Sequence, residues 1–288
     1  METIEIENTD LRAVFQPEWG GLLSALTFNH PAKGWVDAFV TEDQEPAAFK
    51  KIPFFGCFHM VPFANRLIDG TLNGSDADYA FPIVFEEENL AIHGTGWDKP
   101  WQVTEHTATS LTQMHSWSSP DQRYRFQVQF SARLQGASIE LDLTLENLSD
   151  HVLPMGLGFH PWFSDIKRSK IRFDERLRVN RESPWNVYPK PDFDRLPAAF
   201  VPIEFDGLDA GFDDWTKKVH IDLYAKGLSV EMTSSGALDR IHVFVMGQND
   251  RFCVEPVSHK PGDLLDPGFL VGPGNCVSGQ MNLSCSMI

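Results

Sequence analysis

Three residues of this sequence can carry or release a proton although apolar or turn-forming residues surround them. His93 lies in the segment LAIHG, His160 in GFHPWF and Glu255 in FCVEP. An imidazole titrates near neutral pH, and a half-buried carboxylate has a raised pKa because burial disfavours its charged form. Together they could act as general acid and general base. The simpler alternative is a satisfied core histidine and a glutamate that points to solvent.

A neighbouring motif offers groups that hydrogen-bond to hydroxyls. Asn65 and Arg66 precede Asp69 and Gly70, so we expect them where a strand gives way to a turn. Their amide and guanidinium present fixed donors and an acceptor, which suit the hydroxyls of a sugar. The alternative is a turn asparagine and a surface arginine.

An acidic residue and an aromatic residue add to this set. Asp209, in the segment LDAGF, could accept hydrogen bonds from hydroxyls, and Asp213 and Asp214 are close enough to compete for that role. Trp162 offers an aromatic wall for the apolar face of a sugar. Pro161 precedes it and removes a backbone donor, which predicts that the strand ends there and leaves His160 at its terminus.

Taken in chain order, these segments resemble the aldose 1-epimerase (galactose mutarotase) family. The string PFANRLIDG is similar to the family's Asn-Arg-Ile-x-x-Gly segment, IHG to its His-Gly element, and GFHPWF to its Gly-x-His-Pro-Tyr-Phe motif, with Trp162 replacing tyrosine. Glu255-Pro256 resembles the family's Glu-Pro segment, and the Pro-Gly at 273–274 its final turn. The matching motifs span residues 61–274.

The resemblance implies an enzyme that interconverts the α and β anomers of a free aldose without a cofactor or a metal. It makes Glu255 the base on the C1 hydroxyl and His160 the acid on the ring oxygen, with His93 binding substrate and assisting the acid. The residues that it assigns to holding the sugar are Asn65, Arg66, Asp209 and Trp162.

Three alternatives remain open at this point. A sugar-binding or sensor protein would use the same aromatic wall and hydroxyl-binding groups without turnover. A glycoside hydrolase would need two carboxylates, which Glu255 and Asp209 could supply. A metal site from His93, His160, His259 and Glu255 is chemically conceivable, although the helical His-x-x-x-His spacing is absent.

Alternating apolar residues predict the fold. They recur in 124–130 and 139–145, separated by the turn signal QGAS, which indicates a β-hairpin, and again in 219–223, 228–232, 241–245 and 277–283. Five prolines between 184 and 215 predict loops with short strands at most. The sequence therefore predicts an all-β, large antiparallel β-sandwich that forms a single domain over residues 1–288.

Charge and composition narrow the partners. A formal net charge of −16 opposes nucleic acid, anionic membranes and polyanionic substrates, and favours a neutral ligand. The resemblance implies that this ligand is a small-molecule aldose. No signal-peptide pattern or long apolar run is visible, and the four cysteines form no Cys-x-x-Cys pair. We therefore expect a cytoplasmic protein with reduced thiols that acts as a monomer or a homodimer.

Overall fold

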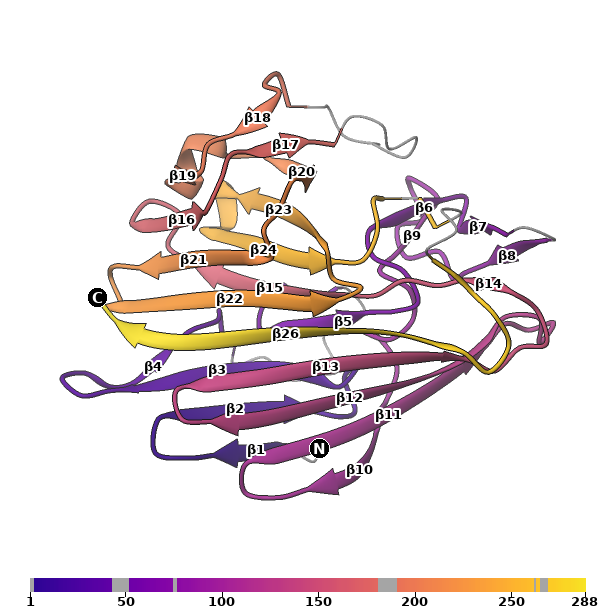
Figure 1. Ribbon diagram of the computed structural model, residues 1–288, viewed down its shortest axis with the longest axis horizontal. Helices are drawn as coiled ribbons and strands as arrows, with labels where there is room; N and C mark the ends of the chain where they lie inside the picture. Colours follow the sequence, from indigo (N-terminus) through magenta and orange to yellow (C-terminus); the bar gives the residue numbers. More distant parts are fainter. Residues whose placement is uncertain (1–2, 43–51, 75–76, 181–190, 262, 265–268) are drawn as a thin grey trace.

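Two large antiparallel sheets account for most of the computed structural model, which describes residues 3–42, 52–74, 77–180, 191–261, 263–264 and 269–288 (Figure 1). The first sheet has 11 strands within these residues, in the spatial order β1 (Ile4–Glu7), β2 (Leu11–Gln16), β3 (Leu22–His30), β5 (Cys57–Met60), β15 (Gly158–Ser164), β24 (Arg251–Val257), β23 (Arg240–Met246), β20 (Asp209–Asp213), β17 (Leu177–Val179) and β18 (Arg195–Leu196), with β4 (Gly34–Asp37) pairing with β3.

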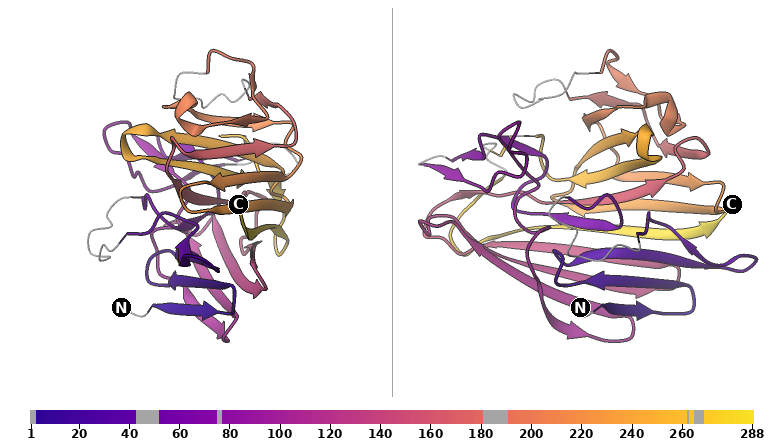
Figure 2. Two further views of the ribbon diagram at one scale, coloured as in Figure 1. Left: turned by 90° about the vertical axis from the view of Figure 1, so that its left-hand side faces the viewer. Right: turned by 180° about the vertical axis from the view of Figure 1, so that it is seen from behind.

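The second sheet has nine strands within the same residues. Their order is β10 (Gln102–His106), β11 (Ser110–Ser118), β12 (Arg125–Gln135), β13 (Ser138–Asn147), β26 (Cys276–Met287), β22 (Leu228–Gly236), β21 (Lys218–Leu223), β16 (Ser169–Phe173) and β19 (Ala199–Phe200). The side view in Figure 2 shows the N-terminal strands of the first sheet and the strands of the second in separate layers. The predicted antiparallel β-sandwich is confirmed.

Three two-stranded sheets complete the described strands. They are β6 (Arg66–Ile68) with β9 (Leu90–Ile92), β7 (Thr71–Asn73) with β8 (Asp78–Ala80), and β14 (Leu153–Pro154) with β25 (Leu270–Val271). The 3-10 helices that lie wholly within the described residues are η2 (Pro202–Phe205) and η3 (Gly247–Asn249). None of the helices that the structure describes has the length and apolar character needed to cross a membrane.

The predicted strands are present in the expected places. The hairpin of β12 and β13 turns between Gln135 and Ser138, which pair with each other. The later alternating runs became β21, β22, β23 and β26. The proline-rich stretch predicted to be irregular lies partly outside the described residues, and from residue 191 onward it holds the short elements β18, β19, η2 and β20.

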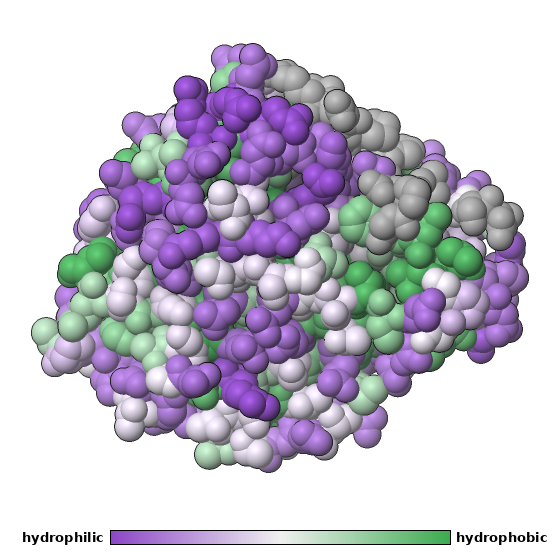
Figure 3. All heavy atoms as spheres, in the orientation of Figure 1, coloured by the Kyte–Doolittle hydropathy of each residue, from purple (hydrophilic) through white to green (hydrophobic). Residues whose placement is uncertain are grey.

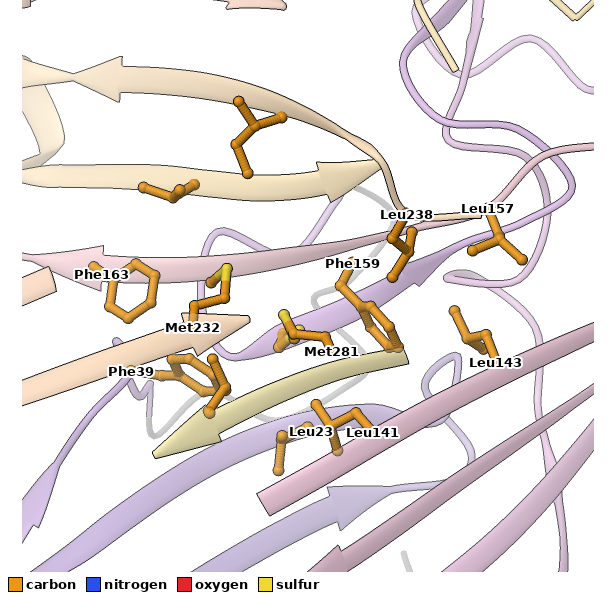
Figure 4. Packing of buried hydrophobic residues seen from close by; sticks show 14 of the residues in the cluster. Leu23, Phe39, Leu141, Leu143, Leu157, Phe159, Phe163, Met232, Leu238 and Met281 are labelled. Atoms are coloured by element: carbon orange, nitrogen blue, oxygen red, sulfur yellow. The ribbon is translucent and has the colours of Figure 1, made fainter. Parts of the chain in front are cut away.

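Apolar side chains from the two sheets meet in one core between the layers. Figure 4 shows Phe159 and Phe163 of β15 pointing toward Met232 of β22 and Met281 of β26. All four are fully buried, with 0% of their surface exposed. Because burial of large apolar side chains is the dominant favourable contribution to folding, this layer fixes the orientation of β15.

The outer face of the second sheet is largely polar. In Figure 3, which views the molecule from this side, most of the surface over the strands is hydrophilic or neutral. The outward positions of β13 and β26 include Asp142 and Gln280, and the Gln280 amide donates a hydrogen bond of 2.9 Å to the Asp142 carboxylate. This face shows the alternation of a sheet with one solvated side.

Candidate active site

Strand alternation places the proton-carrying residues on the face of the first sheet that is turned away from the core. On β15, Phe159 and Phe163 face the core, so His160 and Trp162 face the other way. On β24, Phe252 and Val254 lie in the core, and Glu255 faces the same way as His160. The apolar residues that make the sandwich thus also aim the candidate catalytic groups.

Strand register brings these residues into one row across the sheet. The pairs Gly158↔Val257 and Trp162↔Cys253 place His160 opposite Glu255 on the neighbouring strand. On the far side of β24, Glu255 pairs with His242 of β23. The carboxyl group of Glu255 therefore lies between two imidazoles.

The prediction that His160 ends its strand is wrong, because β15 continues through Pro161 to Ser164. Likewise, β24 continues through Pro256 to Val257. Between β15 and β24, residue pairs form at both ends but not at the level of the two prolines. Because no ladder hydrogen bonds form between the two strands there, the missing backbone N–H of each proline removes none, and both prolines are tolerated.

His160 and Glu255 are in direct contact and both are buried. The distance from His160 Nε2 to Glu255 Oε1 is 3.4 Å, and 4% and 2% of the two residues are exposed. Burial raises the pKa of Glu255 to about 7 and lowers the pKa of His160 to about 3. At neutral pH the imidazole of His160 is neutral in the free protein, and Glu255 is the member of the pair that titrates.

A buried chain of polar groups continues from His242 to Arg66. His242 Nε2 lies 2.7 Å from Asp209 Oδ1, and Arg66 donates a hydrogen bond of 2.9 Å to Asp209 Oδ2. Burial would raise the pKa of Asp209, but these two partners outweigh it and lower that pKa. Burial lowers the pKa of His242, but the hydrogen bond to Asp209 and the charge of Glu255 together raise it by more. The pKa of His242 is therefore above its usual value.

Sequence reasoning missed His242. Alone within an alternating apolar strand, it has the pattern of a core histidine. The signal that could have revealed it is the hairpin register: β23 and β24 are joined by a short turn at 247–250, and counting back from that turn pairs residue 242 with residue 255.

Asn65 and His93 line the cavity from the small sheet of β6 and β9. Each has a left-handed backbone, with φ of 64° and 55°, which places their side chains just outside the paired strands. The Asn65 backbone N–H donates to His93 Nδ1 at 3.1 Å, so the proton of the neutral ring is on Nε2. Burial lowers the pKa of His93 well below its usual value. His93 therefore suits a hydrogen-bond donor to substrate better than a source of protons.

The prediction that Asn65 and Arg66 lie where a strand gives way to a turn is also wrong. They stand where β6 begins, after a bend, and not where a strand ends. Arg66 Nη1 donates to Asn65 Oδ1 at 3.0 Å, so the two side chains and Asp209 form one network. The guanidinium is thereby fixed next to the row of His160, Glu255 and His242.

Gly94 allows this arrangement, because its backbone packs directly against Val61. Its φ is +68°, and a Cβ atom there would lie 1.9 Å from the Val61 carbonyl oxygen. We expect Gly94→Ala to lower the free energy of unfolding by about 3 kcal/mol or more, through clash and strain together.

Gly136→Ala is the matched control for this change. Gly136 also has a positive φ, of +55°, but no atom of the described residues lies within 4 Å of the point that a Cβ would occupy, so we expect a loss of about 1 kcal/mol. Urea denaturation of both variants measures the difference, and equal losses would show that the close approach at Val61 has no energetic importance.

The candidate residues surround a cavity of about 180 Å³. The lining contains both polar and apolar residues, which in chain order are Ile52, Phe54, Asn65, Arg66, Phe85, Ile92, His93, His160, Trp162, Asp209, His242, Phe244, Met246 and Glu255. Every residue predicted for the site is among them. A cavity of this size admits a ligand much larger than a water molecule.

Other residues considered from the sequence have structural contacts instead. Asp213 pairs with Arg240 at 2.6 Å, and Asp214 lies 3.3 Å from Arg178. His259 Nε2 accepts from the Ala64 backbone N–H at 3.2 Å. Among the three aspartates, Asp209 is the one whose carboxylate joins the cavity network.

The possible metal ligands named from the sequence differ from the group of ligand atoms that lie close together in the structure. Among the described residues, the group with ligand atoms within 4.8 Å of one another is His160, Cys253 and Glu255. Burial raises the pKa of the Cys253 thiol well above its usual value, so the thiol is protonated in the metal-free protein. Two members of this group, His160 and Glu255, are also the pair in direct contact that lines the cavity.

Comparisons with known proteins agree with this architecture. A curated relative, the uncharacterized protein YphB of Escherichia coli strain K12, is 26% identical over 245 residues, covering 79% of this chain and 82% of the relative. A galactose mutarotase-like protein from Clostridium acetobutylicum has a TM-score of 0.80 at 19% identity, covering 99% of this chain and 95% of that one. A GalM/aldose epimerase homologue from C. elegans has a TM-score of 0.78 at 16% identity, covering 100% and 99%.

These two solved structures show that the chain has the galactose mutarotase-like fold. At the level of sequence, the family model described as aldose 1-epimerase matches residues 2–275. That match takes in the whole of the first sheet, the second sheet apart from β26, and every residue of the cavity. The chain therefore belongs to the aldose 1-epimerase family.

Proposed function

We propose that this protein is an aldose 1-epimerase that interconverts the α and β anomers of a free aldose. The observation that supports this most strongly is the 3.4 Å contact between His160 and Glu255 on one wall of the cavity. The ring oxygen and the C1 hydroxyl oxygen of a sugar are bonded to the same carbon. An acid and a base that lie this close together can therefore reach both oxygens.

The reaction uses a single proton on the pair. With Glu255 ionised and His160 protonated, Glu255 takes the proton of the C1 hydroxyl, His160 gives its proton to the ring oxygen, and the bond between C1 and that oxygen breaks. The pair is left as protonated Glu255 and neutral His160, and rotation about C1–C2 followed by the reverse transfers closes the other anomer. In the free protein, burial favours protonated Glu255 with neutral His160, which is also the state left after ring opening. A shift of that proton from Glu255 to His160 produces the form that begins the reaction.

This one-proton mechanism predicts the direction of the pH dependence. The pair holds one proton below the pKa of Glu255, which is about 7, and none above it. We therefore expect kcat/KM to fall about tenfold per pH unit above roughly pH 8. The charge of His242 lowers the pKa of Glu255, so His242→Gln should move this fall to higher pH. A kcat/KM that instead rises through pH 7 would contradict the one-proton mechanism.

The polar network favours anomer exchange over glycoside hydrolysis. A hydrolase of the usual kind needs a second carboxylate at the scissile bond. Both oxygens of Asp209 already accept hydrogen bonds, from Arg66 and His242. Asp209 is therefore suited to hold the hydroxyl-binding groups in place.

Polarimetry on freshly dissolved pure anomers of neutral aldoses tests the proposal. We expect the approach to equilibrium rotation to accelerate in proportion to protein concentration. Release of reducing sugar from a glycoside at a comparable rate would favour a hydrolase. Saturable sugar binding without any acceleration would favour a sensor.

A further inference from the structure

The cavity has two chemically different ends, which constrain how a sugar lies in it. Across the sheet, the row next to His160 and Glu255 runs from Trp162 on β15 through Cys253 and Phe244 to Asp209 on β20. The β15 end is therefore aromatic, and the β20 end carries the network of charged and polar groups around Asp209.

The aromatic end is a corner built from three rings. Trp162 has Phe54 edge-on at 5.4 Å and Phe244 at 5.9 Å between ring centroids. Met246 lies one step further along β23 and also lines the cavity. The Nε1 atom of Trp162 is buried, so the ring offers no accessible donor. Among the described lining residues, this corner presents carbon and sulfur to a ligand.

The roles of the catalytic pair orient the sugar between these ends. His160 stacks on Trp162 with centroids 5.0 Å apart, so the group that protonates the ring oxygen stands beside the aromatic corner. In an aldopyranose the ring oxygen is bonded to C5, which carries C6. C5 and C6 therefore extend toward Trp162, and the hydroxyls of C2 and C3 lie on the side of His242, Asp209 and Arg66.

Given the proposed function, on which this step rests, we propose that the substrate is an aldose without a hydroxyl or charged group on C6, with 6-deoxyhexopyranoses the class that fits best. A methyl group in the corner buries apolar surface against the three rings. A hydroxyl there would lose its water against carbon and sulfur, because the side chains that form the corner expose no hydrogen-bonding group. The charged network at the opposite end still serves the ring hydroxyls.

Matched sugar pairs that differ only in the 6-hydroxyl provide the experiment. Rates are measured by exchange NMR for D-fucose against D-galactose, for 6-deoxy-D-glucose against D-glucose, and for L-rhamnose against L-mannose. We expect kcat/KM to be about 10- to 100-fold higher for the 6-deoxy member of the pair that is turned over best, which is the range over which an apolar pocket rejects an added hydroxyl. Equal values, or a faster 6-hydroxy sugar in that pair, would overturn the inference while leaving the proposed function intact. No acceleration of any sugar would contradict the proposed function itself.

Met246 tests whether this wall contacts the C6 group. Met246→Gln introduces an amide of similar length and should lower the ratio of the two kcat/KM values at least about threefold, because the amide can hydrogen-bond to a 6-hydroxyl. Met246→Leu is the matched control and should keep the ratio, since it changes shape without adding a polar group. An unchanged ratio in Met246→Gln would place the C6 group elsewhere and overturn the assignment.

Discussion

Replacing Glu255 with glutamine is expected to lower kcat for anomer exchange by about 10²-fold or more, with a much smaller change in sugar binding. The amide keeps the size and the hydrogen bonding of the carboxylic acid but cannot remove the proton of the C1 hydroxyl. Because Glu255 is buried and its pKa is raised, a neutral side chain is well tolerated at this position. Exchange rates at saturating sugar, together with a binding titration, separate the two effects.

Companion variants show whether the loss comes from the proton-transfer pair. His160→Asn should also lower kcat by about 10²-fold or more, and the double variant should lose less than the product of the single losses, because the two residues act as a unit. Glu140→Gln makes the same chemical change at an exposed position on β13 and should leave kcat unaltered. Full activity in folded Glu255→Gln protein would refute the mechanism.

Mild acid is expected to unfold this protein. Burial lowers the pKa of His59, His160 and His259 to about 3, whereas each titrates near 6.5 once unfolded. Below pH 6.5 the unfolded chain therefore binds protons that the folded chain does not, and each histidine removes about 1 kcal/mol of stability per pH unit.

Glu255 opposes this loss. Its pKa is raised to about 7 in the folded state, so between pH 7 and 4.5 the folded chain holds a proton that the unfolded chain lacks. Glu255 thereby offsets the proton uptake of one of the three histidines. His93, whose pKa is also lowered, takes up a further proton on unfolding and adds to the loss of stability. The net fall is about 3 kcal/mol per pH unit between pH 6 and 4.5, enough to unfold a typical domain within that window or just below it.

Urea denaturation at pH 7.5, 6.5, 5.5 and 4.5 measures this fall, and one buried histidine can be isolated by substitution. His59 Nε2 contacts the Gly21 carbonyl at 3.1 Å, so His59→Gln keeps a donor but removes the titration, and the slope should flatten by about 1 kcal/mol per pH unit. His151→Gln, at an exposed position, is the control that should leave the slope unchanged. Constant stability from pH 7.5 to 4.5 would contradict the burial of neutral histidines.

Much of the fold was predictable because it depends on local alternation. The hairpin of β12 and β13 follows from apolar residues at every second position and a short turn that contains Gly136. The same alternation fixes which residues of a strand share a face, so the outward position of Glu255 was implied once Val254 was assigned to the core.

The details of the site were less predictable because they depend on pairing between distant strands. Local rules placed His160 at a strand end, whereas Pro161 is accommodated inside β15 by the gap in the ladder with β24. The cluster of His160, Glu255 and His242 requires the register of β15, a strand about 90 residues earlier in the chain. The left-handed backbone of His93 is followed by Gly94, whose own backbone packs against the distant residue Val61.

Anomer exchange that depends on Glu255 can be measured by exchange NMR on sugars already at anomeric equilibrium, comparing the purified protein with Glu255→Gln. The panel contains D-galactose, D-glucose and their 6-deoxy counterparts, so that a narrow substrate preference does not hide the activity. We expect exchange between α and β signals for at least one sugar, at a rate proportional to protein concentration and reduced about 10²-fold or more in the variant. Exchange no faster than in buffer for every sugar, or equal acceleration by both proteins, would contradict this expectation.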